Sequence, residues 1–212
     1  MSTTILVSGN DTGIGKTVAC SSLARRLSLL GRTSYIKPVE TGVVKPVDAQ
    51  HVSMAAENAK TITLTTFREP LAPVEAAEAE GKAVNFLDLV DETRAHLEKE
   101  AFLLVEGAGG LATPIDEKGR DWLDFAEALP VDFLLLVVEN RLGMLNQVRL
   151  LASRVCDLGV PYGFWLNEVH VQSEAILSAN RRAIARETFS VWAEQRHGSL
   201  EPEQTHFPWE NP

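Results

Sequence analysis

The sequence has little cysteine, no excess of positive charge and no long hydrophobic run. Its two cysteines, Cys20 and Cys156, are expected to be reduced thiols that pack as small apolar groups. Twenty Lys and Arg against 29 Asp and Glu give a formal charge of −9. Because this charge repels nucleic acid and anionic membrane surfaces, we expect neither as a partner.

Further absences concern targeting and metal binding. No apolar run approaches the roughly 20 residues that span a bilayer. The first residues, Met1 to Val7, lack the basic start and long apolar stretch of a signal peptide. The five histidines show no metal-ligand spacing. We therefore expect a cytoplasmic protein without a histidine metal centre.

The chain is long enough and apolar enough to form one domain over residues 1–212. It has 212 residues, of which 45% are hydrophobic, so it can bury a core of its own. Short apolar runs alternate with longer segments of helical spacing, which predicts an α/β fold with a mainly parallel sheet and helices on both faces. The predicted strands are Ile5–Ser8, Thr33–Lys37, Phe102–Glu106, Phe133–Val138 and Tyr162–Leu166.

Two of these strands are unbroken apolar runs, Phe102–Val105 and Phe133–Val138, and we expect them at the centre of the sheet. The segment from Thr61 to Phe86 is interpreted as a loop followed by a short helix, and residues 198–212 show little periodicity. The predicted helices are a first one that ends near Leu30, then Ala49–Ala59, Leu87–Lys99, Leu123–Ala128, Met144–Leu158 and Ser173–Gln195.

The loop from Gly9 to Thr17 joins the first strand to the first helix. A strand, a glycine-rich turn and a helix start place backbone N–H groups around an anion, while Lys16 adds a charge and Thr17 a hydroxyl for Mg²⁺. The loop predicts a triphosphate site. The standard phosphate loop has four residues between its first glycine and the glycine before the lysine. Gly9 lies one residue farther than this from Gly15, so Asn10 stands where the first glycine is expected.

Two charged residues stand at the ends of later predicted strands. Each could either bind a ligand or be an ordinary solvated side chain. Lys37 stands at the expected end of the second strand, where it could meet a γ-phosphate or be solvated. Glu106 ends the third predicted strand before the turn Gly107–Gly110, where it could bind Mg²⁺ or be solvated. Asp48 and Asn167 also have two possible roles, because each could belong to the site or serve as a helix N-cap.

Five motifs in order resemble those of dethiobiotin synthetases, ATP-dependent ligases of the P-loop NTPase superfamily. The first is the phosphate loop with Asp11, where chromosome-partitioning and septum-placing ATPases carry a second lysine. The others are Lys-Pro-Val-Glu-Thr-Gly from Lys37, Val-Glu-Gly-Ala-Gly-Gly around Glu106, Leu-Gly-Met-Leu-Asn from Leu142, and Asn167. They run over most of the chain, so the resemblance covers more than one loop.

The resemblance implies roles for individual residues. It implies that Lys37 and Lys16 are catalytic and that Thr17, Asp48 and Glu106 hold Mg²⁺. It implies ATP contacts from Asp11, Thr12, Gly13, Ile14, Gly15, Lys16, Thr17, Val18, Asp48, Glu106, Asn167 and Pro208. It implies substrate contacts from Thr41, Gly107, Ala108, Gly109 and Gly110, and from Gly143 and Asn146 across the interface of a homodimer.

The implied reaction joins 7,8-diaminononanoate and CO₂ into the ureido ring of dethiobiotin while ATP is cleaved to ADP and phosphate. Two alternatives stay open at this point. One is a related ligase that acts on another amine or carboxylate, because Gly13 and Pro73-Val74 differ from the family pattern. The other is an ATPase switch of the partitioning type.

Overall fold

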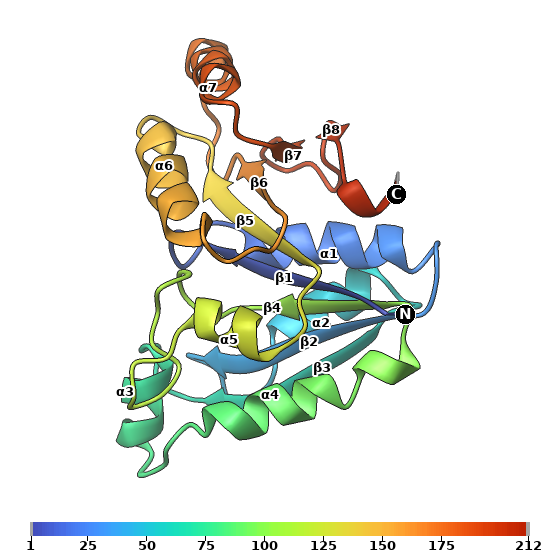
Figure 1. Cartoon of the computed structure of the whole chain (residues 1–212), viewed down its shortest axis with the longest axis vertical. Helices are drawn as coiled ribbons and strands as arrows, with labels where there is room; N and C mark the ends of the chain where they lie inside the picture. Colours follow the sequence, from blue (N-terminus) through green and yellow to red (C-terminus); the bar gives the residue numbers. More distant parts are fainter. Residues whose placement is uncertain (1, 211–212) are drawn as a thin grey trace.

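The computed structural model describes residues 2–210, apart from the side chains of residues 98, 204 and 210. Its centre is one eight-stranded sheet in the order β3-β2-β4-β1-β5-β6-β7-β8 (Figure 1). The strands are β1 (Thr3–Gly9), β2 (Thr33–Thr41), β3 (Lys60–Phe67), β4 (Phe102–Glu106), β5 (Phe133–Glu139), β6 (Tyr162–Asn167), β7 (Val191–Gln195) and β8 (Gln204–Thr205).

The strands β1 to β7 are all parallel, and only β8 runs antiparallel to its neighbour β7. The continuous apolar strands β4 and β5 flank β1 at the centre, which confirms their predicted position. In this register Val7 lies beside Glu106, so the end of β4 is next to the start of the phosphate loop. Parallel strands thus bring several strand ends to one edge of the sheet.

Helices cover both faces of this sheet, as predicted for an α/β fold (Figure 1). One apolar core lies under α1 and α2, and the other under α3 to α6. None of the helices in the described residues is long and apolar enough to cross a membrane. The helices are α1 (Lys16–Leu27), α2 (Asp48–Ala55), α3 (Pro73–Ala79), α4 (Phe86–Arg94), η1 (Leu97–Lys99), α5 (Trp122–Ala128), α6 (Met144–Val155), α7 (Glu174–Glu187) and η2 (Pro208–Glu210).

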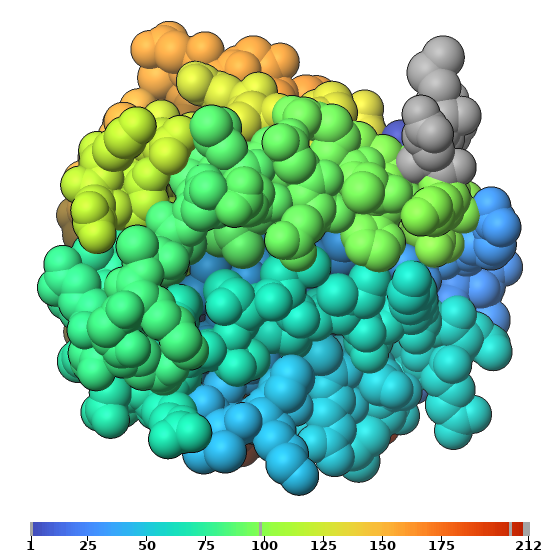
Figure 2. Space-filling view, turned by 90° about the horizontal axis from the view of Figure 1, so that it is seen from below, coloured from blue at the N-terminus to red at the C-terminus, as the bar shows by residue number. Residues whose placement is uncertain are grey.

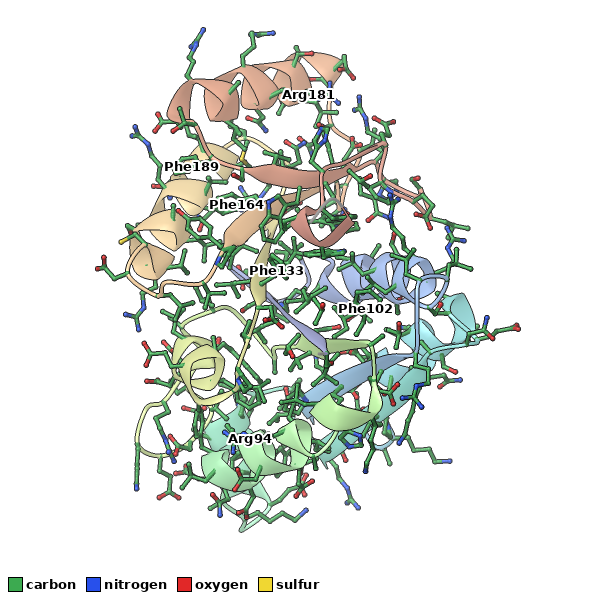
Figure 3. The ribbon with its side chains drawn as sticks, turned by 45° about the vertical axis from the view of Figure 1, so that its right-hand side comes forward. Arg94, Phe102, Phe133, Phe164, Arg181 and Phe189 are labelled. Carbon is green, nitrogen blue, oxygen red and sulfur yellow. The ribbon has the colours of Figure 1, made fainter. Side chains whose placement is uncertain are left out.

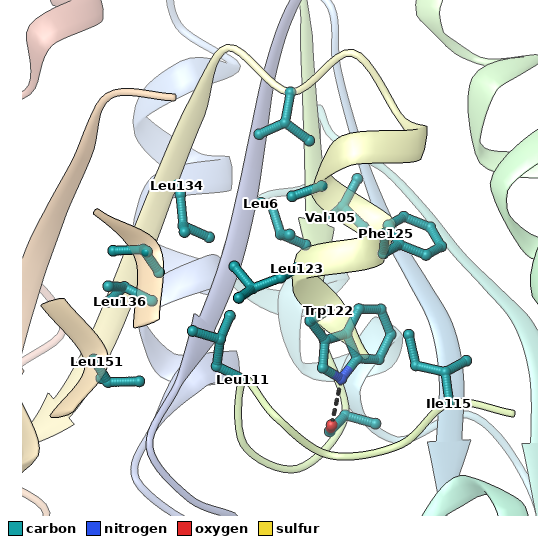
Figure 4. Close-up of a cluster of buried hydrophobic side chains, with 14 of the residues drawn as sticks. Leu6, Val105, Leu111, Ile115, Trp122, Leu123, Phe125, Leu134, Leu136 and Leu151 are labelled. Carbon is teal, nitrogen blue, oxygen red and sulfur yellow. Dashed lines mark hydrogen bonds between the residues drawn. The ribbon is translucent and has the colours of Figure 1, made fainter. Parts of the chain in front are cut away.

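Trp122 anchors the glycine turn after β4 to the core under α5. The indole is fully buried, and its Nε1 donates to the carbonyl of Ala108 at 2.8 Å (Figure 4). Asp121 caps α5 by accepting from the N–H groups of Leu123 and Asp124, which fixes where this helix begins. The turn from Gly107 to Gly110 is therefore held by packing and by a buried hydrogen bond.

The segment predicted as a loop from Thr61 is instead strand β3. Its sequence, Lys-Thr-Ile-Thr-Leu-Thr-Thr-Phe, alternates polar and apolar residues and is rich in β-branched threonine, which favours an edge strand. β3 lies at one edge of the sheet beside β2, and its residues are at the surface on the face shown in Figure 2. The short helix predicted after the loop is present as α3.

The last predicted helix was extended too far. α7 ends at Glu187, where Thr188 takes a left-handed conformation with φ 59°, and the following residues form strand β7. Phe189, in the link between them, contacts Phe164 of β6 with ring centroids 5.8 Å apart (Figure 3). With this ring packed against β6, the following residues pair with β6 as strand β7 and the helix does not continue.

The residues after β8 form an aromatic cluster at the amino end of the strands. Phe207 stacks on Trp209 with ring centroids 4.8 Å apart and on Trp165 at 6.1 Å. Trp209 also meets Phe133, the first residue of β5, at 5.2 Å. Because β8 is antiparallel, the chain has returned to the edge opposite the phosphate loop.

Candidate active site

A cavity of about 580 Å³ opens at the carboxyl ends of β1, β2 and β4. This edge is the usual ligand site of open α/β sheets. Twelve of the residues singled out in the sequence line it, namely Thr12, Gly13, Gly15, Lys16, Thr17, Val18, Lys37, Thr41, Asp48, Glu106, Ala108 and Gly109. Motifs that are far apart in the sequence thus meet in one place.

The phosphate loop has a backbone that requires glycine. Gly13 and Gly15 have φ of 75° and 93°, in the left-handed region. A Cβ on Gly15 would lie 2.0 Å from the Nδ2 of Asn167, and that Nδ2 donates to the Ile14 carbonyl at 2.9 Å. α1 has no side-chain N-cap, which leaves its first N–H groups available to an anion.

Lys16 lies across the loop, and its Nζ donates to the carbonyl of Asp11 at 2.6 Å. Burial, together with repulsion from the nearby Lys37, lowers the pKa of Lys16 to about 8. A bound polyanion would offset both effects, because opposite charge favours the protonated amine. The loop therefore places a desolvated cation where phosphate oxygens would be held.

Glu106 is the centre of the polar network. Its Oε1 accepts from the Thr17 hydroxyl at 2.9 Å and from Lys37 Nζ at 2.6 Å, while its Oε2 accepts from the Tyr35 hydroxyl at 2.9 Å. The side chain is only 1% exposed, so the interpretation of Glu106 as a solvated acid is wrong. Three donors fix the direction of this carboxylate.

Lys37 lies between two carboxylates. Its Nζ is 2.8 Å from Asp48 Oδ2 in addition to its contact with Glu106. Burial alone would lower the pKa of Lys37, but Glu106 and Asp48 outweigh it and raise the pKa above its ordinary value. Lys37 is 4% exposed, so the solvated interpretation is wrong here too, although β2 continues past it to Thr41.

Asp48 and Asn167 are not helix caps. Asp48 is the first residue of α2, whose N-cap position is Val47, and its carboxylate turns to Lys37. Asn167 ends β6, and its amide is 6% exposed and tied to the phosphate loop. The N-cap interpretation is therefore wrong for both residues.

The oxygen atoms of Thr17, Asp48 and Glu106 fit a small hard cation. The Asp48 and Glu106 carboxylates meet at Lys37 Nζ, the Thr17 hydroxyl contacts Glu106, and Mg²⁺ prefers such oxygen ligands with further positions filled by phosphate and water. Within residues 2–210, no group of three or more His, Cys, Asp or Glu side chains has the arrangement of a metal site. The fit thus depends on the Thr17 hydroxyl together with nucleotide oxygens.

Several residues in or beside the cavity are given no role from the sequence. Tyr35 and Glu40 lie on β2; Glu40 and Thr113 line the cavity, as do the apolar residues Val43, Val47 and Pro70–Pro73. The segment Pro70–Pro73 follows β3. Because the sequence does not predict β3, it does not predict that this segment lies at the carboxyl edge of the sheet either. Glu40 lies inside the Lys-Pro-Val-Glu-Thr-Gly motif, and its charge in a buried strand was the available signal.

Other residues from the sequence lie outside the cavity lining. Asp11, Ile14, Gly107 and Gly110 belong to the same two loops, while Gly143 and Asn146 are exposed at the start of α6. Pro208 begins η2 beside Phe207, in the aromatic cluster at the opposite edge of the sheet. We therefore leave Pro208 out of the site proposed below.

The chain is similar in sequence to known proteins over most of its length. A family model described as an AAA domain matches residues 3–189. An ATP-dependent dethiobiotin synthetase of Anaeromyxobacter dehalogenans is 34% identical over 191 residues, which cover 87% of this chain and 85% of that protein. The one from Mycobacterium leprae is also 34% identical, over 87% of this chain and 83% of its own length.

Solved structures show similarity of fold alone. The signal recognition particle receptor FtsY of Elizabethkingia anophelis in complex with GDP gives a TM-score of 0.61 at 13% identity, over 98% of this chain and 61% of that one. The septum site-determining protein MinD of Pyrococcus horikoshii, complexed with Mg-ADP, gives 0.58 at 14% identity, over 92% and 82%. This chain spans less than two thirds of the FtsY chain.

Proposed function

This chain belongs to the AAA-domain family and, within it, to the ATP-dependent dethiobiotin synthetases, and we propose that it forms the ureido ring of dethiobiotin from 7,8-diaminononanoate and CO₂. The family membership makes it an ATP-dependent ligase of biotin synthesis. The observation that carries the finer proposal is the meeting of Lys16, Lys37 and Glu106 in the cavity that adjoins the phosphate loop.

The reaction proceeds in three balanced steps. One amine of the substrate adds to CO₂ and releases a proton, which leaves a carbamate. A carbamate oxygen attacks the γ-phosphorus of ATP and expels ADP, which gives a carbamic-phosphoric anhydride. The second amine then attacks the carbamate carbon, loses a proton and expels phosphate, which closes the ring.

The two lysines act on the phosphoryl group. Phosphoryl transfer spreads negative charge over the γ-oxygens, so fixed cations in a desolvated site lower its barrier. Lys16 holds the β- and γ-phosphates against the loop, and Lys37 remains protonated because its pKa is raised. Thr17, Asp48 and Glu106 would hold Mg²⁺ that enters with ATP, and the ion would supply further charge neutralisation.

The diamine lies beside the phosphate end of the cavity. Thr41 and the turn Gly107–Gly110 contact its amines and carbamate, and the apolar wall Pro70–Pro73 faces its hydrocarbon chain. Gly143 and Asn146 hold its carboxylate from the second subunit of a homodimer. The start of α6 supports this role, because it is exposed and has no side-chain cap on its N–H groups.

The adenine base contacts Asn167 beside the phosphate loop. An amide offers both a donor and an acceptor, which suits the paired edge of adenine. One hydrogen of its Nδ2 is donated to Ile14, so the second hydrogen and the carbonyl Oδ1 are the donor and acceptor assigned to the base.

Phosphate release with ATP and bicarbonate, with and without 7,8-diaminononanoate, tests the proposal. We expect release to require the diamine and dethiobiotin to appear by mass spectrometry in equal amount. Release without any amine, stimulated instead by a protein partner, would favour an ATPase switch. Inactivity with the diamine but turnover with another amine or carboxylate would favour a related ligase.

A further inference from the structure

Glu40 makes a pair of hydrogen bonds that connects β2 to the start of α2. Its Oε1 accepts from the backbone N–H groups of both Val47 and Asp48, each at 2.9 Å. Its Oε2 has a longer contact, 3.5 Å, with the hydroxyl of Thr63 on β3. The side chain is 4% exposed, although it lies on the wall of the cavity.

The helix that receives these bonds has no cap of its own. The first N–H groups of a helix lack partners within it and are normally satisfied by a side chain at the N-cap position. That position in α2 is Val47, which has no hydrogen-bonding side chain. Glu40 supplies the acceptor from a strand instead.

The bonds set the position of Asp48. The loop before α2 is attached at its start, where Gly42 and Val43 donate to the carbonyls of Glu69 and Phe67. Val44 is exposed, and the next attachment is the pair of bonds to Glu40. The backbone N–H of Asp48, whose carboxylate lies 2.8 Å from Lys37 Nζ, is thus bonded directly to Glu40.

We infer that Glu40 is a positioning residue for the metal and lysine site, which acts by fixing the backbone of Asp48. It touches none of the reacting atoms. The inference rests on the proposed metal role of Asp48. It concerns the acceptor geometry of the Glu40 carboxylate rather than its charge, and this difference can be tested with two conservative substitutions.

Glu40→Gln keeps the length and one acceptor oxygen but removes the charge. Glu40→Asp keeps the charge but shortens the side chain, so its oxygen no longer reaches Val47 and Asp48. Glu80 offers a matched control, because it also accepts from a backbone N–H, that of Arg68 at 2.7 Å, and does not line the cavity. The four proteins are wild type, Glu40→Gln, Glu40→Asp and Glu80→Asp.

Mn²⁺ binding in the presence of ADP, followed by electron paramagnetic resonance, gives the first readout. We expect Glu40→Asp to raise the half-saturating Mn²⁺ concentration roughly tenfold, the lower end of the range for residues that orient metal ligands. Glu40→Gln and Glu80→Asp should stay near wild type. Amide hydrogen exchange at Val47 and Asp48 gives the second readout, and should become faster in Glu40→Asp alone.

Three outcomes overturn the inference. They are unchanged Mn²⁺ affinity in Glu40→Asp, equal weakening in Glu40→Gln, and no Mn²⁺ binding by wild type with ADP. Neither readout uses the diamine or CO₂, so the inference about Glu40 and the proposed reaction can be refuted independently. Weakened Mn²⁺ binding in Glu40→Asp, in a protein that does not turn over the diamine, would keep this inference and remove the proposed reaction.

Discussion

Replacement of Tyr35 by phenylalanine removes one hydroxyl from the centre of the site and leaves the ring in place. The side chain is fully buried, and its hydroxyl donates to Glu106 Oε2 at 2.9 Å. Hydrogen bonds to charged groups contribute about 1.5–3 kcal/mol. For a chain of this length each kcal/mol moves the melting temperature by roughly 2–4 °C, so we expect a drop of about 3–12 °C.

Thermal and urea unfolding would measure this loss, and the other tyrosine provides the control. The Tyr162 ring meets Phe164, and no hydrogen bond of its hydroxyl is found in the described residues. Tyr162→Phe should therefore change the unfolding free energy by less than about 0.5 kcal/mol. If Tyr35→Phe costs no more than this control, the hydroxyl does not stabilise the Glu106 carboxylate.

The same pair of proteins has a predicted pH dependence. Burial and the charge of Glu106 raise the pKa of Tyr35 well above the ordinary value of about 10. The unfolded state therefore loses this proton first, and stability due to Tyr35 falls as pH rises above about 10. The stability difference between wild type and Tyr35→Phe should shrink over that range. A constant difference would refute the assignment.

Further predictions concern catalysis and the thiols. Lys37→Ala should lower the turnover number by roughly 10²–10³ while the KM for ATP changes little, because its charge acts on the transferring phosphoryl group; an unchanged rate of diamine-dependent phosphate release would remove its catalytic role. Glu106→Gln should raise the Mg²⁺ concentration needed for half-maximal activity; an unchanged requirement would leave metal binding to Thr17 and Asp48. Cys156 should react quickly with a thiol reagent, whereas Cys20 should react only after unfolding, because it is buried and burial raises its pKa. Labelling of both thiols at equal rates in the folded protein would contradict this.

Much of the sheet could be predicted because its central strands are continuous apolar runs. Buried strands such as β5 are apolar from Phe133 to Val138, and glycine marks the start of α1. β3 is not predicted because this edge strand has four threonines and only three apolar residues among its eight. α7 was extended because no proline or glycine marks its end, which depends on the contact of Phe189 with the sheet.

The candidate site was predictable where charge stood at the end of an apolar strand. Glu106 ends β4 and fits this description, whereas Lys37 lies inside β2 and stands out through the motif that it begins; the register of the parallel strands brings the two together. The roles of Tyr35 and Glu40 could not be predicted from the sequence. The partner of Tyr35 lies 71 residues away along the chain, and the hydrogen bonds of Glu40 depend on the conformation of a loop. The resemblance implies an ATP contact for Pro208, but the antiparallel direction of β8 puts this residue at the other edge of the sheet.

The hydrogen bond between Asn167 and Ile14 has a consequence for how kinetic data on this enzyme can be interpreted. It joins residues 153 positions apart, and Gly15 leaves only enough room for that amide. A substitution at Asn167 would therefore loosen the phosphate loop as well as remove the contact proposed for the base. Selectivity between ATP and other nucleotides should be compared as a ratio within each variant, since absolute affinities would mix the two effects.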